Sequence, residues 1–138
     1  MLDERKNVLF LCTGNSCRSQ MAEGWANHLR SRDLIAFSAG VNPGRLNERA
    51  VAVMKEAGVD ISNHIPRHIS DFAGLEFDLI VTVCDNAKEL CPVFPGKGKV
   101  LHNKFDDPSG IIAAEEETMA QFRRVRDEIR NFVENLEI

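Results

Sequence analysis

Cys12 and Arg18 enclose five small or polar residues, directly after an apolar segment at residues 7–11. The apolar segment is typical of a short buried strand, and the residues from Ser19 onward carry apolar side chains at helical spacing. The loop therefore joins a strand to the beginning of a helix, where backbone N–H groups bind anions and stabilise a thiolate. This arrangement predicts a cysteine nucleophile, Cys12, inside a cradle for a tetrahedral oxyanion.

The cradle, residues 12–18, has several groups suited to anion binding. Gly14 lets the backbone turn back on itself, and Arg18 is able to donate two parallel hydrogen bonds to paired oxygens of the anion. Ser19, as an N-cap or first-turn hydroxyl, is placed to donate to the sulfur of Cys12. The positive end of the helix should favour the thiolate of Cys12 over its thiol. The predicted oxyanion-binding residues are Thr13, Gly14, Asn15, Ser16, Cys17 and Arg18.

The alternative is structural, with Cys12 as a buried, unreactive residue and Arg18 as a solvated charge. A cysteine and an arginine at this spacing, with a glycine between them in a strand–loop–helix segment, favour the catalytic interpretation instead.

The length and composition of the chain limit the number of domains, the kinds of partner and the cellular compartment that we expect. The 138 residues suffice for a single domain, which we expect to span residues 1–138. A net charge of -4 gives no broad basic surface, so nucleic acid is not expected as a partner and anion selectivity must be local. Because the sequence has neither a membrane-length apolar run nor a signal-peptide core, we expect a cytoplasmic protein. In that reducing compartment, four cysteines favour catalysis or metal binding over structural disulfides.

Apolar runs alternate with amphipathic segments along the chain, which indicates an α/β fold around a parallel sheet. We predict strands near 7–11, 34–38, 78–83 and 99–102. We predict helices near 19–31, 47–57, 86–91 and 115–135. The first helix should bury Trp25, and the second should begin after a cap at Asn47 and end at Gly58. The last helix should dock an apolar stripe onto the sheet.

Reactive side chains follow three of the predicted strands. Cys12 follows the first strand, Cys84 the third, and Asp107 comes soon after the fourth. Since parallel strands end at the same edge of a sheet, we expect these three residues to meet. Asp107 precedes Pro108, which holds it in an extended conformation from which its carboxylate could move a proton to or from a departing oxygen. An ordinary Asp-Pro turn is the alternative.

Cys84 and Cys91 form a second candidate pair, with Pro92 directly after them. In a regular helix over 86–91 their seven-residue offset corresponds to about 10 Å of rise, which is too far for a disulfide. A bond between them therefore requires this short segment to unwind. The spacing fits poorly with a zinc site, and two partly buried thiols without a role are a further alternative.

Several motifs together resemble those of the thioredoxin-coupled arsenate reductases, which have the low-molecular-weight protein tyrosine phosphatase fold. The matching segments are 12–24, 38–40, 60–62, 84–91 and 105–108, and the similarity runs over nearly the whole chain. The resemblance implies a three-layer α/β fold with an open, parallel, four-stranded sheet flanked by helices. Phosphatases share the oxyanion cradle, whereas the pair of Cys84 and Cys91 distinguishes the reductases.

The resemblance also implies a redox relay. Cys12 would attack arsenate held by Arg18 and the cradle amides, with Asp107 assisting the loss of an oxygen. Cys84 would then attack Cys12 and release arsenite, and Cys91 would attack Cys84. Thioredoxin would reduce the resulting Cys84–Cys91 disulfide.

The implied catalytic residues are Cys12, Arg18, Ser19, Cys84, Cys91 and Asp107. The implied partners are an arsenate-like or phosphate-like oxyanion and thioredoxin. We expect no cofactor and no membrane partner, and we expect a monomer because no extra apolar stripe stands out in the sequence. Cys17 has no step in this relay and is expected to support packing.

Family members that bind K⁺ use an Asn, a Glu, a Ser and an Asp, and this sequence departs from that set at one position. Asn15, Glu23 and Ser38 are present, but Arg67 occupies the place of the Asp. A guanidinium repels a cation, so we expect no metal site, and we expect Asn15 to shape the loop through local hydrogen bonds.

Two other classes of function remain open. The first is a protein tyrosine or small-molecule phosphatase that uses Cys12, Arg18 and Asp107 through a phosphocysteine intermediate. The residues after Asp107 offer no aromatic wall for a tyrosine, which argues against tyrosine specificity. The second is a non-catalytic module that senses an anion or a metal, and such a module would not need Cys12.

Overall fold

The computed structural model describes residues 4–84, 98–110 and 113–138. Cys91 and the helix predicted at 86–91 lie outside these ranges. Each helix within the ranges is too short or too polar to cross a membrane.

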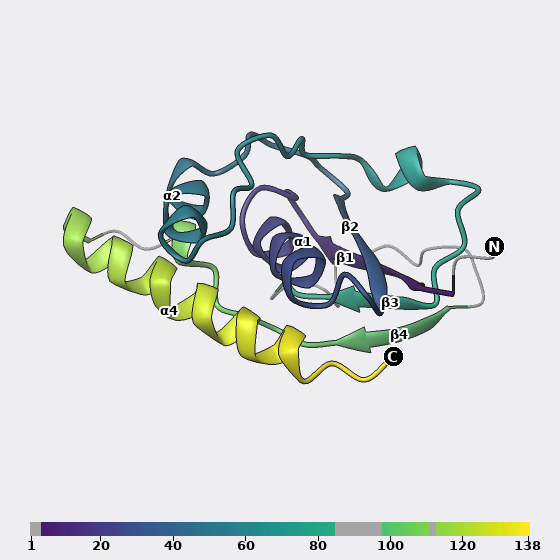
Figure 1. The fold of residues 1–138 in the computed structure, drawn as a ribbon. Helices are drawn as coiled ribbons and strands as arrows, with labels where there is room; N and C mark the ends of the chain where they lie inside the picture. Colours follow the sequence, from purple (N-terminus) through teal and green to yellow (C-terminus); the bar gives the residue numbers. More distant parts are fainter. Residues whose placement is uncertain (1–3, 85–97, 111–112) are drawn as a thin grey trace.

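Four parallel strands form the sheet (Figure 1). They are β1 (Lys6–Cys12), β2 (Leu34–Gly40), β3 (Leu79–Thr82) and β4 (Lys99–His102), arranged in the order β2-β1-β3-β4. Val8 lies opposite Ala36 on β2 and Leu79 on β3, so β1 is an inner strand. The predicted parallel α/β sheet is confirmed, with strand bounds close to those predicted. The chain leaves β1 for β2 on one side and returns to β3 on the other, which is the place where open α/β sheets bind ligands.

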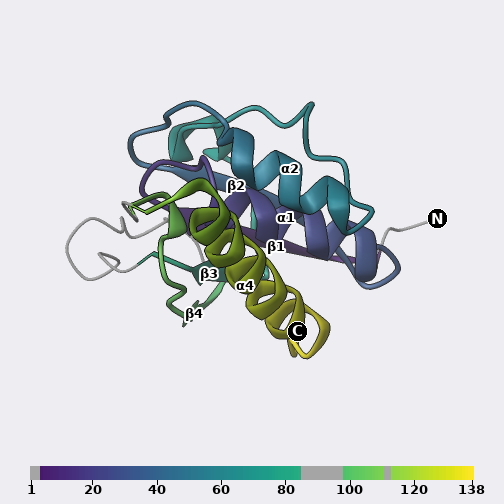
Figure 2. The same cartoon turned by 90° about the vertical axis from the view of Figure 1, so that its left-hand side faces the viewer.

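The α-helices of the described ranges pack over one face of the sheet. They are α1 (Arg18–Leu29), α2 (Glu48–Glu56) and α4 (Glu115–Glu134), and Figure 2 shows α4 running beside the other two. Trp25, Met54 and Phe122, one from each helix, are at most 1% exposed and belong to one core cluster. The predicted burial of Trp25 and of the apolar stripe on the last helix is confirmed.

The ends of α1 and α2 follow from local chemistry. The side-chain oxygen of Asn47 accepts hydrogen bonds from two backbone N–H groups in the first turn of α2, and Gly58 follows this helix with a φ of 89°. Both features confirm the predicted cap and stop. Helix α1 begins at Arg18 without a side-chain cap, so Ser19 is a first-turn residue and its alternative placement as the N-cap is wrong.

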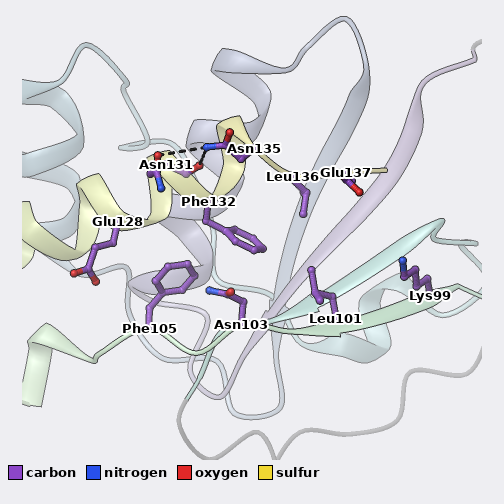
Figure 3. A pocket seen from close by; sticks show the side chains of 10 residues that line it. All are labelled: Lys99, Leu101, Asn103, Phe105, Glu128, Asn131, Phe132, Asn135, Leu136 and Glu137. Atoms are coloured by element: carbon purple, nitrogen blue, oxygen red, sulfur yellow. Dashed lines mark hydrogen bonds between the residues drawn. The ribbon is translucent and has the colours of Figure 1, made fainter.

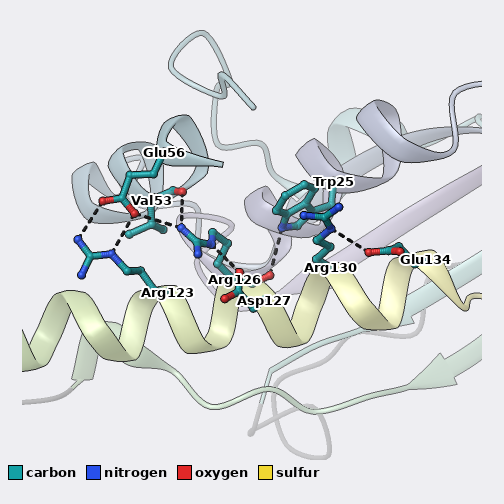
Figure 4. Close-up of polar contacts among 8 residues, drawn as sticks. All are labelled: Trp25, Val53, Glu56, Arg123, Arg126, Asp127, Arg130 and Glu134. Atoms are coloured by element: carbon teal, nitrogen blue, oxygen red, sulfur yellow. Dashed lines mark hydrogen bonds and ion pairs between the residues drawn. The ribbon is translucent and has the colours of Figure 1, made fainter. Parts of the chain in front are cut away.

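Polar contacts fix α4 against α1 and α2 (Figure 4). The indole nitrogen of Trp25 donates to the carbonyl oxygen of Arg126 (3.1 Å), and the guanidinium of Arg130 lies 5.0 Å from the Trp25 ring centroid. Arg126 donates to the carbonyl oxygen of Val53 (2.9 Å) and to Glu56 (3.1 Å). Helix α4 therefore holds α1, and with it the cradle, in place on the sheet.

The other face of the sheet packs against the region of the 3₁₀ helix η1 (Ile69–Phe72). Buried strand residues such as Leu9 lie there, beneath three phenylalanine rings that meet edge to face. These rings belong to Phe37, Phe72 and Phe77. Strand β1 is covered on both faces, which explains its almost continuously apolar sequence.

Candidate active site

The carbonyl oxygens of the cradle point away from its interior. Those of Thr13, Gly14 and Ser16 accept 2.9 Å hydrogen bonds from backbone N–H groups in segment 42–47. Because peptide groups are planar and trans, the N–H of each following residue points to the opposite side. One of these, the N–H of Gly14, donates to the sulfur of Cys12. The cradle therefore turns backbone donors toward Cys12, as an anion-binding nest does.

Strand β2 ends against the cradle at Gly40. A Cβ atom at this position would lie 2.5 Å from the carbonyl oxygen of Thr13 and 2.9 Å from that of Cys12. The N–H of Gly40 donates to the carbonyl oxygen of Arg67 (2.9 Å), which ties β2 to the next loop as well. Only glycine fits this close approach of three backbone segments.

Asn15 fixes the turn of the cradle. It is fully buried and has a φ of 47°, in the left-handed region that residues other than glycine rarely adopt. Its Oδ1 accepts from the backbone N–H of Arg67 (2.8 Å) and from Nε2 of Gln20 (3.0 Å). The amide nitrogen therefore faces Ser19 and donates to its Oγ (2.9 Å). The prediction that Asn15 shapes the loop by hydrogen bonding is confirmed.

Cys12 ends β1, Cys84 lies two residues after β3, and their side chains are in hydrogen-bonding contact. The Cys84 contact and burial raise the pKa of Cys12, whereas Arg18 and the N–H of Gly14 lower it. The prediction that the cradle favours the Cys12 thiolate is therefore wrong while the two sulfurs are in contact, because the cradle's positive charge is outweighed. Two adjacent sulfurs resist ionising together, so the pair retains one proton.

Arg18 reaches from the beginning of α1 to the segment that follows β4. Its Nη1 donates to the carbonyl oxygen of Phe105 (3.0 Å), and its Nη2 lies 3.6 Å from Oδ2 of Asp107. Its Nε is buried and has no hydrogen-bond partner among the described residues. A buried donor without a partner destabilises the protein by about 1–3 kcal/mol, so Nε is available to donate a hydrogen bond to a group bound in the cradle. Nε and Nη2 together form the edge of the guanidinium that binds paired oxygens.

Asp107 lies beside Arg18, with its side chain 39% exposed. Its Oδ1 accepts from the backbone nitrogen of Ser109 (3.0 Å) and from the hydroxyl of the same residue (2.5 Å). Burial, together with the charge of Asp107, raises the pKa of Cys17 to about 12, so Cys17 stays a thiol. Cys17 packs in the main core cluster, in keeping with its expected supporting part.

The structure thus brings together Cys12, Cys84 and Asp107, the three residues expected to meet at the strand ends, around Arg18. Cys91 lies outside the described residues, so its pairing with Cys84 stays a prediction.

A partly buried network behind the cradle was missed by reasoning from the sequence. Because Nε2 of Gln20 donates to Asn15, its Oε1 is an acceptor, and Nδ1 of His64 lies 2.9 Å from it. Oε2 of Glu23 is 3.1 Å from the same nitrogen, so Nδ1 must carry a hydrogen. Burial raises the pKa of Glu23, although His64 and the hydroxyl of Ser38 lower it. The signal available was the three-residue spacing of Gln20 and Glu23 on one helix face.

Residues of the same network occupy the positions at which some family members bind K⁺. Oδ1 of Asn15 already accepts two hydrogen bonds, and the carboxylate of Glu23 accepts from Ser38 (2.8 Å) and from His64. The positive charge of Arg67 also acts on Glu23. Across the described ranges no group of three His, Cys, Asp or Glu side chains could hold a metal ion. These residues do not fit a bound cation, and no chemical step is assigned to one.

A groove of about 540 Å³ lies between β4 and the C-terminal half of α4 (Figure 3). The rings of Phe105 and Phe132 meet edge to face in it, with their centroids 5.6 Å apart. Phe105 also accepts from Arg18 through its carbonyl oxygen, so it separates the groove from the cradle. None of the predicted catalytic residues that lie within the described ranges lines this groove.

The comparison with known proteins agrees with this geometry. The model of the low molecular weight phosphotyrosine protein phosphatase family matches residues 7–137, and the chain belongs to that family. The arsenate reductase of Bacillus subtilis (strain 168) is 48% identical to this chain over 128 residues, which are 93% of this chain and 92% of that protein.

Two solved structures give the same picture. An arsenate reductase in the oxidized state superposes with a TM-score of 0.79 at 32% identity, over 95% of each chain. An arsenate reductase in the phosphate binding state superposes with a TM-score of 0.77 at 32% identity, over 94% of this chain and 95% of the other. The resemblance inferred from the motifs, including the phosphatase-like α/β fold, is confirmed.

Proposed function

We propose that this chain is an arsenate reductase that converts arsenate to arsenite with Cys12 as the nucleophile. The observation that carries the proposal is the buried Nε of Arg18, which lacks a partner among the described residues and lies in a cradle of inward-facing N–H groups. Such donors match the paired oxygens of a tetrahedral oxyanion. The relatives named arsenate reductase and the neighbour in a phosphate binding state support this substrate class.

In the first step, the sulfur of Cys12 attacks the arsenic of bound arsenate. Cys12 attacks as the thiolate while Cys84 keeps the one proton of the pair. A sulfur–arsenic bond forms as one arsenic–oxygen bond breaks, and the departing hydroxyl group leaves as water after taking a proton from Asp107. Arg18 and the cradle N–H groups stabilise the charge on the remaining oxygens. Arsenic stays in its pentavalent state in this step.

In the second step, Cys84 attacks the sulfur of Cys12. A disulfide forms, the sulfur–arsenic bond breaks with its electron pair going to arsenic, and trivalent arsenite departs with the proton that Cys84 gives up. The contact between Cys12 and Cys84 supports this order, because a pair that retains one proton presents its two sulfurs as nucleophiles one at a time. Following the family pattern, Cys91 then attacks Cys84 to regenerate Cys12, and a thioredoxin dithiol reduces the Cys84–Cys91 disulfide.

The remaining expectations complete the proposal. The chain acts as a single domain over residues 1–138, as a cytoplasmic monomer that takes its electrons from thioredoxin and uses no cofactor. Its substrate is the small oxyanion, and neither nucleic acid nor a membrane is a partner.

A phosphatase is the second candidate function, because the family match and the cradle apply equally to phosphate. In that case Cys12 would form a phosphocysteine, Asp107 would protonate the leaving oxygen, and water would release phosphate. Cys84 beside Cys12 favours the reductase, since hydrolysis has no use for a second thiol in contact with the nucleophile.

The proposed function is tested by following NADPH oxidation with arsenate, thioredoxin and thioredoxin reductase, omitting each component in turn. We expect sustained oxidation that needs every component and is lost in Cys12→Ser. Absence of turnover, together with hydrolysis of an aryl phosphate that survives Cys84→Ser and Cys91→Ser, would establish the phosphatase instead.

A further inference from the structure

The two oxygens of the Asp107 carboxylate have different surroundings. Oδ1 accepts two hydrogen bonds from Ser109, one from its backbone nitrogen at 3.0 Å and one from its hydroxyl at 2.5 Å. Oδ2 lies 3.6 Å from Nη2 of Arg18, which places it on the side of the cradle. Only Oδ2 is therefore directed toward a bound anion.

We propose that Ser109 is a positioning residue whose hydroxyl holds the carboxyl group of Asp107 so that Oδ2, the oxygen that carries the transferable proton, faces the cradle. This inference rests on the proposed function, in which Asp107 protonates the oxygen lost from arsenate. The backbone N–H of Ser109 can only donate, so a hydrogen on Oδ1 would meet another hydrogen. A neutral Asp107 carboxyl must therefore carry its proton on Oδ2.

The chemical step follows from that placement. As the arsenic–oxygen bond breaks, the oxygen leaves with the bonding electron pair and takes the proton from Oδ2. Asp107 is left as a carboxylate whose Oδ1 is still held by Ser109 and whose Oδ2 faces Arg18. No group is oxidised or reduced in this step, and solvent returns the proton to Oδ2 before the next cycle.

The backbone that carries Asp107 is anchored independently of the Ser109 hydroxyl. Asp106 forms an ion pair with Arg124 of α4 (3.1 Å), and Pro108 is buried at the beginning of the short helix η2 (Pro108–Gly110). The backbone N–H of Ser109 also remains in any variant of its side chain. Removing the hydroxyl should therefore change the orientation of the carboxyl group more than the path of the loop.

The same local arrangement occurs elsewhere in the chain and provides a matched control. The backbone N–H of Ser62 donates to Oδ1 of Asp60 (2.8 Å), and hydrogen bonding from Ser62 lowers the pKa of that carboxyl. Asp60 makes no contact described for the cradle. A purely structural contribution of Ser109, as an ordinary turn serine, would make its removal resemble the removal of Ser62.

The test is a single-turnover measurement of arsenite release by fully reduced protein without thioredoxin, over a range of arsenate concentrations. We expect Ser109→Ala to lower the limiting rate about fivefold to tenfold, as for the loss of one ordinary hydrogen bond, with the half-saturating concentration unchanged. Ser109→Thr, which keeps a hydroxyl, should restore the rate. Ser62→Ala should leave the limiting rate and the half-saturating concentration unchanged. Adding Ser109→Ala to the Asp107→Asn variant should lower its limiting rate no further.

Equal limiting rates for wild type and Ser109→Ala would overturn the inference, as would a change confined to the half-saturating concentration. If wild-type protein releases no arsenite, the proposed function itself fails. The same variants are then compared in the hydrolysis of phenyl phosphate, whose leaving oxygen also needs a proton. An unaffected Ser109→Ala in that reaction, or a wild-type protein inert toward both substrates, would equally overturn the inference.

Discussion

At the scale of single residues, the site combines an anion-binding arginine with a pair of thiols that retains one proton. Arg18 is held at Nη1 by the Phe105 carbonyl, which leaves Nε and Nη2 for an anion. Cys12 in contrast has its pKa raised by contact with Cys84 and by burial. Holding the proton between the two sulfurs lets one act as nucleophile first and the other second.

Cys84→Ala tests this account of the Cys12 pKa. The variant removes the hydrogen bond and the charge that raise the pKa, while Arg18 and the N–H of Gly14, which lower it, remain. The folded-state pKa should fall, so the thiolate should appear at lower pH than in the wild type. We expect the midpoint of the pH dependence of Cys12 alkylation by iodoacetamide, followed by mass spectrometry, to move to lower pH.

Cys17 does not interfere with that measurement, because its pKa is raised to about 12. A midpoint that stays unchanged or moves to higher pH in Cys84→Ala would contradict the account.

At the scale of elements, the cradle is held by what packs behind it. Backbone N–H groups of segment 42–47 donate hydrogen bonds to the carbonyl oxygens of the cradle, and β2 packs against the cradle at Gly40. Helix α4 holds α1 through the hydrogen bond between Trp25 and Arg126. The strands and α-helices within the described ranges were predictable because their periodicity is strong and their caps are local, as Asn47 shows. In the network of Gln20, His64 and Glu23, only the shared helix face of Gln20 and Glu23 was predictable, because His64 lies far away in the sequence.

Gly40→Ala tests the support of the cradle by β2. The new Cβ would lie 2.5 Å from the carbonyl oxygen of Thr13, so the cradle must shift. We expect a loss of stability of about 1–3 kcal/mol in urea unfolding and at least a tenfold weaker binding of phosphate by titration calorimetry. Gly44→Ala is the matched control, because a Cβ there meets nothing within 4 Å. Equal phosphate affinity in the two variants would contradict the account.

At the scale of the whole molecule, an acidic protein with a net charge of -4 presents a local site for an anion. Positive charge is concentrated at the edge of the sheet by Arg18 and the beginning of α1, where the ends of β1 and β3 bring Cys12 and Cys84 together. The proximity of these two cysteines to Asp107 was predictable because parallel strands end at the same edge of a sheet. The direction in which the pKa of Cys12 shifts was not predictable, because it depends on the contact with the Cys84 thiol after another strand, which no local sequence pattern reveals.

The most direct test of the central claim is one turnover of the Cys91→Ser variant, in which the relay should stop after its second step. Reduced protein is mixed with arsenate, alkylated and analysed by mass spectrometry, with Cys12→Ser as the control. We predict one arsenite per protein and a Cys12–Cys84 disulfide, and neither product in the control. Full alkylation of Cys12 and Cys84 with no arsenite released would contradict the account.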